Sequence, residues 1–132
     1  MKVRAFFPCE KVVQRKHGLL DILGYGFRGI TLKRKDDDEY AKATVDIFVD
    51  IFFSLGEEGE KTIEIKLYGP DGELLSETEP LNVNVKKGEA GINLRKNFEL
   101  RARKNGSHSL KLIVSETEAD DWPIKIKIND VS

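Results

Sequence analysis

The sequence predicts an all-β protein, built as an antiparallel two-sheet sandwich of about eight strands. The clearest observation is the segment 44–55 (TVDIFVDIFFSL), whose odd-numbered positions are all apolar. Because successive side chains of a strand point to opposite faces, one face of this segment belongs to a core. Two further observations agree: no window has a helical hydrophobic period, and turn signals recur at short intervals. Eight strands suit a jelly-roll or an immunoglobulin-like arrangement, and the sequence leaves both open.

The first half of the chain is expected to hold two further strands before that segment. Residues 2–7 form a short opening strand, which ends at Pro8 because proline cannot donate a hydrogen bond to a ladder. A polar turn at 14–18 (QRKHG) then leads into the extended run 19–30 (LLDILGYGFRGI). The three glycines of this run indicate bulges and a strongly bent strand. A charged loop at 33–42 (KRKDDDEYAK) follows it.

The second half alternates more regularly, and turn signals divide it into short strands. The segment 69–72 (GPDG) is a tight turn, because proline fixes one dihedral angle and glycine supplies a positive one. Asn105-Gly106 is a strong hairpin signal, and Lys96 interrupts the parity of its strand, which predicts a bulge or kink. No helix is available to cross between parallel strands, so we expect antiparallel pairing. The strands expected here span 62–68, 81–85, 92–102, 110–114 and 124–128.

Length and charge restrict the classes of function that the chain can have. The 132 residues are expected to form a single domain, 1–132, long enough to bury a core without disulfides or metals. Lys and Arg total 22 and Asp and Glu total 23, which gives a net charge of -1. No global field therefore attracts nucleic acid or an anionic membrane, and we expect neither as a partner.

The sequence also indicates a cytoplasmic protein. Cys9 is the single cysteine, which excludes an intrachain disulfide and fits a reducing compartment. The segment 1–13 is charged and interrupted by Pro8, unlike a signal peptide, and the longest apolar-rich stretch is too short to span a bilayer. A charged fraction of 34% with one Cys, one Met and one Trp slightly favours a heat-adapted source, although a solubilised surface has much the same composition.

The order of motifs resembles a family of small prokaryotic proteins of unknown function that are predicted to be β-sandwiches. The resemblance rests on the opening strand, the glycine-punctuated segment 17–27 (HGLLDILGYGF), the turn Pro70-Asp71-Gly72 and the closing hairpin. Members carry a DG-x-L-x-L-x-G run near the start, which 17–24 matches loosely, and a P-D-G turn between the middle strands. The chain departs from the family in the acidic loop 36–39 and in 116–122. The resemblance implies a β-sandwich and supplies no catalytic residue.

Candidate catalytic and metal-binding residues are few. Cys9, His17 and His108 are the thiol and imidazoles of the chain, and their spacing does not indicate a nucleophilic pair with an orienting third group. The acidic run 36–39 could supply calcium ligands together with the pair 120–121. Contiguous carboxylates point in different directions, however, so a solvated loop explains the run more simply. We therefore expect no enzyme, no catalytic residue, no cofactor and no metal.

Basic and aromatic positions give two further hypotheses. Lys111, Lys125 and Lys127 are expected on the outer face of the last two strands, where lysines commonly protect a sheet against aggregation. This face lacks the aromatic side chains on which nucleic-acid bases stack. Trp122 and Tyr68 could form a platform that stacks on sugars, although a lone tryptophan at the start of a strand more often anchors a loop.

The strongest functional hypothesis concerns the even-numbered face of the segment 44–55. This face carries Asp46, Phe48, Asp50 and Phe52, which is too acidic for an interior and too aromatic for an ordinary surface. We interpret these four residues as an interface, since exposed apolar patches mark interaction sites. Covering of the two phenylalanines by another part of the same chain is the equal alternative.

Two classes of function follow from these observations. The first is a non-catalytic protein-interaction or accessory module, which forms a homo-oligomer or binds an unidentified protein partner. The alternative is a ligand-binding β-sandwich, which holds calcium or carbohydrate in the loops 33–42 and 116–122. Neither the biological process nor the partner is encoded in a motif of this chain.

Overall fold

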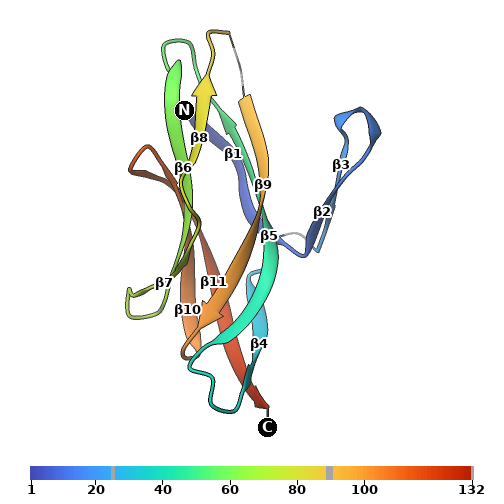
Figure 1. Ribbon diagram of the computed structural model, residues 1–132, viewed down its shortest axis with the longest axis vertical. Helices are drawn as coiled ribbons and strands as arrows, with labels where there is room; N and C mark the ends of the chain where they lie inside the picture. Colours follow the sequence, from blue (N-terminus) through green and yellow to red (C-terminus); the bar gives the residue numbers. More distant parts are fainter. Residues whose placement is uncertain (25, 89–90, 132) are drawn as a thin grey trace.

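The computed structural model shows an elongated all-β protein and describes residues 1–24, 26–88 and 91–131 (Figure 1). The expected all-β class is confirmed, since these residues form strands and one short 3-10 turn, η1 (Lys16–Gly18). No helix within these three segments is long and apolar enough to cross a membrane. The strands are β1 (Lys2–Cys9), β2 (Lys11–Gln14), β3 (Leu20–Leu23), β4 (Gly29–Lys35), β5 (Ala41–Phe52), β6 (Gly59–Tyr68), β7 (Leu74–Glu77), β8 (Leu81–Val85), β9 (Gly91–Ala102), β10 (Gly106–Val114) and β11 (Thr117–Val131).

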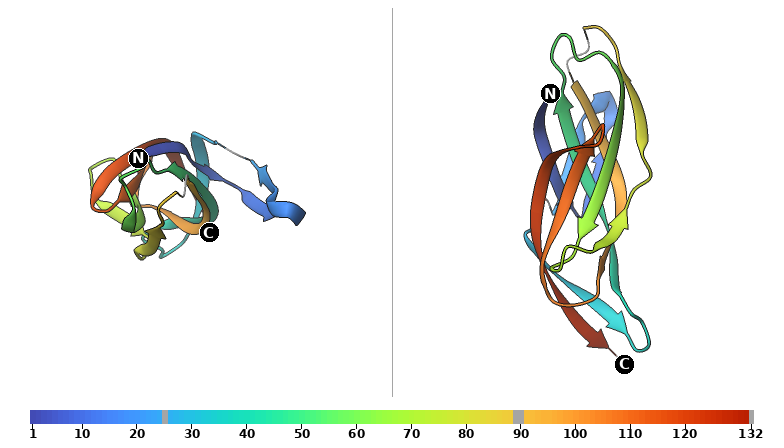
Figure 2. Two further views of the ribbon diagram at one scale, coloured as in Figure 1. Left: turned by 90° about the horizontal axis from the view of Figure 1, so that it is seen from above. Right: turned by 90° about the vertical axis from the view of Figure 1, so that its left-hand side faces the viewer.

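Most of the strands belong to two sheets that share one core. The smaller sheet has the order β1-β5-β9 and is antiparallel. The larger sheet has the order β4-β11-β10-β6-β7, and β8 also pairs with β6. It curls around the core as a half-barrel, and the smaller sheet faces its open side (Figure 2). The remaining pair, β2 and β3, stands apart from both sheets.

The predicted antiparallel two-sheet sandwich, in either its jelly-roll or its immunoglobulin-like form, is wrong. β11 pairs in parallel with β4, from Lys125 opposite Gly29 to Val131 opposite Lys35, so the larger sheet is mixed. Parallel neighbours need a long connection, and here the connection is the whole chain between the two strands. The absence of a crossover helix excluded only parallel pairs that follow each other closely in the sequence.

The odd-numbered side chains of β5 lie at the centre of the core, as their alternation predicts. Val45, Ile47, Val49 and Ile51 are all buried. The strand ends at Phe52, so Leu55, which was expected inside, is 84% exposed. The larger sheet covers this face of β5 with the buried side chains Ile63, Ile65, Leu67, Leu110, Leu112, Ile124 and Ile126.

The expected bent strand over 19–30 is in fact two strands that belong to different parts of the molecule. β3 pairs with β2, whereas β4 is the edge strand of the larger sheet. Gly24 and Gly26 lie between them with positive φ angles of 62° and 72°, which glycine adopts without steric cost. Tyr25 lies outside the described residues. The glycines thus mark a change of direction rather than bulges within one strand.

The tight turn predicted at 69–72 is confirmed, since the N–H of Gly72 donates to the carbonyl oxygen of Gly69 at 3.0 Å between the paired strands β6 and β7. Other signals of the second half differ from their expected roles. Asn105-Gly106 does not close a hairpin, because β9 and β10 belong to different sheets. The tight hairpin lies at Ser115 and Glu116, both with positive φ angles, and the expected loop 116–122 is largely the start of β11. The register between β5 and β9 is continuous, so the expected bulge at Lys96 is absent.

Candidate functional site

The most distinctive feature of the fold is an arm that stands away from the body. The arm consists of β2, η1 and β3, residues 11–23, and projects beside the smaller sheet (Figures 1 and 2). Within the described segments its strands pair only with each other, from Lys11 opposite Leu23 to Gln14 opposite Leu20. An isolated two-stranded hairpin is marginally stable in water, so the arm depends on contacts with the body.

Val12 is the residue that joins the arm to the body. Its backbone N–H donates to Oδ2 of Asp46 at 2.9 Å, and its carbonyl oxygen accepts from Nη1 of Arg95 at 2.7 Å. Its side chain is only 2% exposed. Both backbone groups of one arm residue are therefore held by side chains from β5 and β9.

Asp46 links the arm to the outer face of the smaller sheet. Its side chain is 8% exposed, and its second oxygen, Oδ1, accepts from Nδ2 of Asn97 at 3.1 Å. Both carboxylate oxygens are thus used as acceptors in a nearly buried position. The alternation of 44–55 places Asp46 on the correct face of the strand, but no local signal indicates Val12 and Asn97 as its partners.

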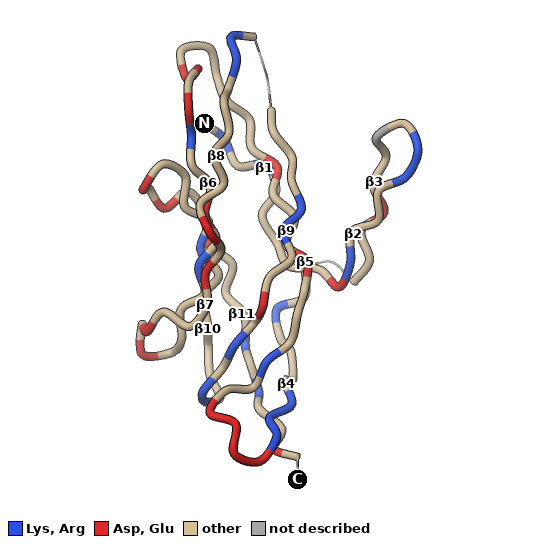
Figure 3. The backbone as a smooth tube through the Cα atoms, viewed as in Figure 1, with Lys and Arg blue, Asp and Glu red and all other residues tan. Residues whose placement is uncertain are grey.

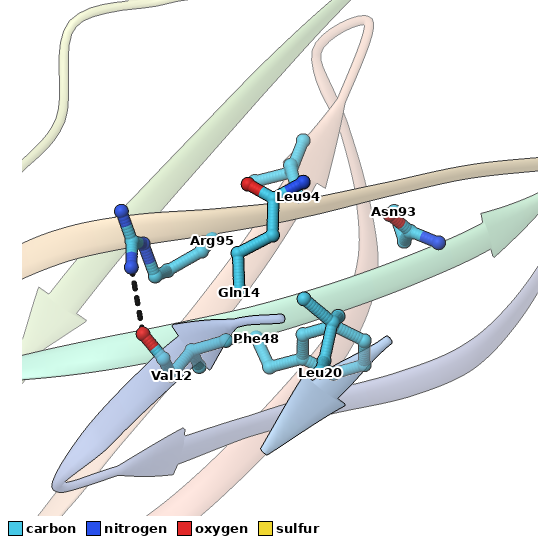
Figure 4. A pocket seen from close by; sticks show the side chains of 7 residues that line it. All are labelled: Val12, Gln14, Leu20, Phe48, Asn93, Leu94 and Arg95. Carbon is cyan, nitrogen blue, oxygen red and sulfur yellow. Dashed lines mark hydrogen bonds between the residues drawn. The ribbon is translucent and has the colours of Figure 1, made fainter. Parts of the chain in front are cut away.

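A cleft lies between the arm and the smaller sheet (Figure 4). Phe48 forms its floor, and the ring of Phe48 packs on that of Phe7 with centroids 5.5 Å apart. The arm contributes Gln14 and Leu20 in addition to Val12. β9 contributes Asn93, Leu94 and Arg95 on the other side, and the volume of the cleft is about 300 Å³.

Arg95 is the charged group of this cleft. The hydrogen bond to Val12 holds one of its N–H groups, and a guanidinium has five. Among the described residues, no other hydrogen bond or ion pair involves its side chain. The cleft therefore offers an exposed guanidinium that is held at one N–H, next to Phe48 in the register of β5 and β9, with donors that have no partner among the described residues.

Phe52 and Asp50 complete the face that was interpreted as an interface. Phe52 is half-buried, and the guanidinium carbon of Arg4 lies 4.8 Å from the centroid of its ring. Phe48 is also half-buried, under the arm and beside Phe7. Asp50 lies between the two phenylalanines and has no hydrogen bond or ion pair within the described part of the chain. Participation of these residues in an interface stays a prediction.

Cys9 lies at the base of the arm and is fully buried. Its Sγ donates to the backbone oxygen of Asp46 at 3.4 Å. Burial, together with the negative charge of Asp46, raises the pKa of the Cys9 thiol to about 11. A thiol with so high a pKa is a poor nucleophile at neutral pH.

The raised pKa of Cys9 predicts a loss of stability in alkaline solution. Above its ordinary pKa of 9.0 the unfolded chain releases the thiol proton, whereas the folded chain keeps it until about pH 11. The stabilising contribution is full below pH 9.0 and is lost as the pH rises to about 11. We expect urea unfolding to show a steeper decline across this range for the wild type than for Cys9→Ala. Parallel curves for the two proteins would contradict the shift, and the comparison removes the contribution of lysines and tyrosines.

The acidic segments predicted to bind calcium do not converge. The run 36–39 follows the end of β4, which lies beside the last residues of β11, whereas Asp120 and Asp121 lie near the first residues of β11. About ten residues of extended strand, roughly 33 Å, separate the two ends. In the described segments no group of three or more His, Cys, Asp and Glu side chains is placed to hold a metal ion.

The fold also separates Trp122 from Tyr68, the expected aromatic platform, and His17 from His108. Trp122 pairs with Leu110, whose side chain is in the core, whereas Tyr68 pairs with Ser109 on the outer face. Nε1 of Trp122 donates to the carbonyl oxygen of Phe27 at 3.0 Å, so this indole anchors the chain that enters β4. His17 lies in η1 of the arm, and His108 is buried in β10.

Comparisons with known proteins leave the family of the chain open. No family model and no curated protein matches it. One solved structure that resembles it is Pseudomonas fluorescens alkylpurine DNA glycosylase AlkC bound to DNA containing an abasic site analog, with 5% identity and a TM-score of 0.41. The match covers 76% of this chain and 28% of the glycosylase chain. So distant a likeness supports no function.

These findings correct the function predicted from the sequence. An interaction or accessory module was inferred from an uncovered aromatic face, but Phe48 and Phe52 are half-buried and each contacts a side chain of its own chain. Binding of calcium or carbohydrate was assigned to the loops 33–42 and 116–122, which lie toward opposite ends of β11 and are partly strand. The comparisons give neither function any support.

Proposed function

We propose that the protein is a binding protein, and not an enzyme, whose arm cleft holds a small carboxylate with an apolar body. The observation that carries this proposal is the position of Arg95 at the edge of the cleft, with one N–H held by Val12 and no partner for the others in the part of the chain that the structure describes. A guanidinium with a fixed orientation suits a carboxylate, because it can donate two parallel hydrogen bonds to it. This ligand differs from calcium and carbohydrate in its chemistry and in its place on the fold.

The remaining lining of the cleft suits the apolar part of such a ligand. Leu20 and Phe48, both half-buried, present aliphatic and aromatic surface, while Gln14 and Asn93 add amide groups. No hydrogen bond to another described residue uses either of these two amides, so both can contact a ligand. A volume of about 300 Å³ is at the lower end of the range for small-molecule sites.

Titration of the labelled protein with hexanoate and benzoate, followed by amide chemical shifts, tests the proposal. We expect both carboxylates to shift the amides of Val12, Phe48 and Arg95, and hexanol and benzyl alcohol to bind more weakly. Arg95→Gln is expected to weaken binding of the carboxylates roughly 10- to 100-fold, the effect of one charge-assisted interaction. Lys96→Gln is the matched control, because it makes the same change of charge at the next residue and is expected to have no effect.

Three outcomes would contradict this proposal. One is equal binding of the alcohols and the carboxylates, and another is an equal loss of affinity in Lys96→Gln. The third outcome needs a control, because Arg95 also holds the arm. Hydrogen exchange of the Val12 amide in Arg95→Gln shows whether the arm stays in place: slow exchange means that it does, and exchange as fast as in an unstructured chain means that it has moved. In that case Phe48→Ala provides the second variant, and unchanged carboxylate binding there would exclude the cleft.

We retain three expectations from the sequence as part of the proposal. The assignment as a non-enzyme is supported by the buried thiol of Cys9 and by the separate positions of His17 and His108. A cytoplasmic, heat-adapted protein is supported by the single cysteine and by the charged fraction of 34%. Membership of the family of small prokaryotic proteins of unknown function is supported by the quoted motifs alone.

A further inference from the structure

A row of lysines runs along the outer face of the parallel pair β4 and β11. Lys125 and Lys127 are exposed on β11, and Lys33 and Lys35 are exposed on β4. The register places Lys33 opposite Asn129 and Lys35 opposite Val131, so the lysines of β4 continue the row that begins on β11. Alternate residues of a strand are about 6.6 Å apart, which makes the row roughly 20 Å long.

Lys42 extends this row toward the smaller sheet. It is exposed near the start of β5, which lies beside β4. Figure 3 shows basic residues gathered along β4 and the neighbouring ends of β5 and β9. We refer to Lys33, Lys35, Lys42, Lys125 and Lys127 as the lysine surface.

The charge of the lysine surface is not neutralised within the described part of the chain. None of its five members has a carboxylate oxygen within ion-pair distance there. Two other lysines of the larger sheet differ in this respect: Lys111 pairs with Glu118 at 2.8 Å, and Lys66 lies 3.7 Å from a carboxylate oxygen of Glu64. The net charge of -1 therefore conceals a local excess of positive charge on this face of the protein.

The residues that lie between these lysines indicate which kind of polyanion, a membrane, a single strand or a duplex, the surface suits. Thr31, Asn129 and Ser107 are exposed around them, and no exposed large hydrophobic residue lies on β4 or β11. A membrane-bound face usually inserts aromatic or aliphatic side chains, which this surface lacks. A single-stranded nucleic acid is usually held by aromatic rings that stack on its bases; β4 has none, and the ring of Tyr40, two residues before Lys42, is already in contact with Arg101 and Arg103.

We infer that the lysine surface binds the phosphate backbone of double-stranded nucleic acid without regard to sequence. Lysine side chains act as point charges on phosphate and need no contact with the bases. This inference departs from the expectation, based on net charge, that nucleic acid is not a partner. It also lies outside the proposed function, because the arm cleft is on the smaller sheet.

The acidic turn 36–39 limits the surface at one end. Asp36, Asp37 and Asp38 are exposed directly after Lys35 and have no ion pair among the described residues, whereas Glu39 pairs with Arg103 at 3.0 Å. Their charge repels phosphate, which restricts contacts to the strands. Removal of two of these charges is therefore expected to tighten binding.

Fluorescence anisotropy with a labelled 20-base-pair DNA duplex tests the inference. We expect wild-type binding at about 50 mM salt that weakens steeply as salt rises, since each phosphate contact adds about 0.9 to the logarithmic slope. The double variant Lys33→Gln with Lys127→Gln is expected to lower this slope by about 2 and to raise Kd about tenfold. Lys86→Gln with Lys87→Gln makes the same change of charge beyond β8 and is expected to leave both values unchanged.

Variants of the turn provide the opposite test. Asp36→Asn with Asp38→Asn is expected to lower Kd about twofold or more at low salt, because repulsion over the lysine surface falls. No binding at about 50 mM salt would overturn the inference, as would an equal loss in the control pair. Tighter binding to the single strand of the same sequence would also overturn it, and so would binding to anionic phosphatidylserine vesicles with none to the duplex. The arm variant Arg95→Gln is expected to keep wild-type affinity for the duplex, which separates this test from that of the cleft.

Discussion

Replacing Asp46 with alanine is expected to release the arm and to lower the free energy of unfolding by about 2 to 4 kcal/mol. The carboxylate accepts from the backbone N–H of Val12 at 2.9 Å and from the amide of Asn97 at 3.1 Å. Alanine offers no acceptor, and Val12 is only 2% exposed, so water reaches its abandoned N–H poorly, whereas the exposed amide of Asn97 can bind water instead. An unsatisfied buried donor costs about 1 to 3 kcal/mol, and loss of the hydrogen bond to Asn97 and of the contacts of the released arm adds the remainder.

Hydrogen exchange and urea unfolding together measure this effect. The Val12 amide is expected to exchange faster in Asp46→Ala under native conditions, before the body unfolds, and the thiol of Cys9 is expected to become reactive. Asp50→Ala is the matched control, because Asp50 lies two residues further along the same face and has no polar partner among the described residues. Asp46→Asn keeps one acceptor oxygen and is expected to fall between the two. Unchanged exchange at Val12 in Asp46→Ala would show that the arm is held by other contacts.

The alternation of 44–55 predicted the buried face of β5 because burial of one face is a local property of a strand. The odd-numbered side chains from Val45 to Ile51 are buried. Their burial requires a second sheet over this face, but it does not depend on which strands form that sheet. The same pattern says nothing about which strand lies alongside, since any neighbour with correct parity satisfies it. The parallel pairing of β4 with β11 was therefore invisible, and the prediction of a sandwich failed at that point.

The arm shows a second limit of sequence patterns. The polar turn at 14–18 was recognised, and the short segments on either side of it do pair as β2 and β3. The four residues on each side, KVVQ and LDIL, have no clean alternation and were too few to separate an independent hairpin from one long bent strand. The glycines at 24 and 26 indicated unusual backbone, but glycine at positive φ occurs both in bulges and where the chain changes direction.

The candidate site was predictable in part. Phe48 is predicted as a site residue because an aromatic side chain on the outer face of a strand indicates that something covers or binds it, and Phe48 does line the cleft. Arg95 and Val12 carried no such signal, since an arginine in a polar strand and a valine in a short one are ordinary. Their roles come from hydrogen bonds that join residues far apart in the sequence.

Ile47→Ala should destabilise the body as strongly as Asp46→Ala but leave the arm in place. Ile47 is 0% exposed and points into the core from the opposite face of the same strand. Truncation of a buried isoleucine to alanine costs about 2 to 5 kcal/mol, from lost burial and from the cavity that remains. Because the register of β5 with β1 and β9 depends on the backbone, Asp46 is expected to keep its bonds to Val12 and Asn97.

The two adjacent variants thus separate the stability of the core from attachment of the arm. Urea unfolding of Ile47→Ala is expected to show a lower midpoint with an unchanged slope, because the surface exposed on unfolding stays the same. In Ile47→Ala the Val12 amide is expected to exchange faster only because the whole protein unfolds more often. In Asp46→Ala the same amide also exchanges through a local opening of the arm. Ile47→Val, which removes one methylene, is expected to cost about 1 kcal/mol by the same mechanism. Selective loss of Val12 protection in Ile47→Ala would mean that packing of the core beneath β5 also holds the arm, and that its attachment does not depend on Asp46 and Arg95 alone.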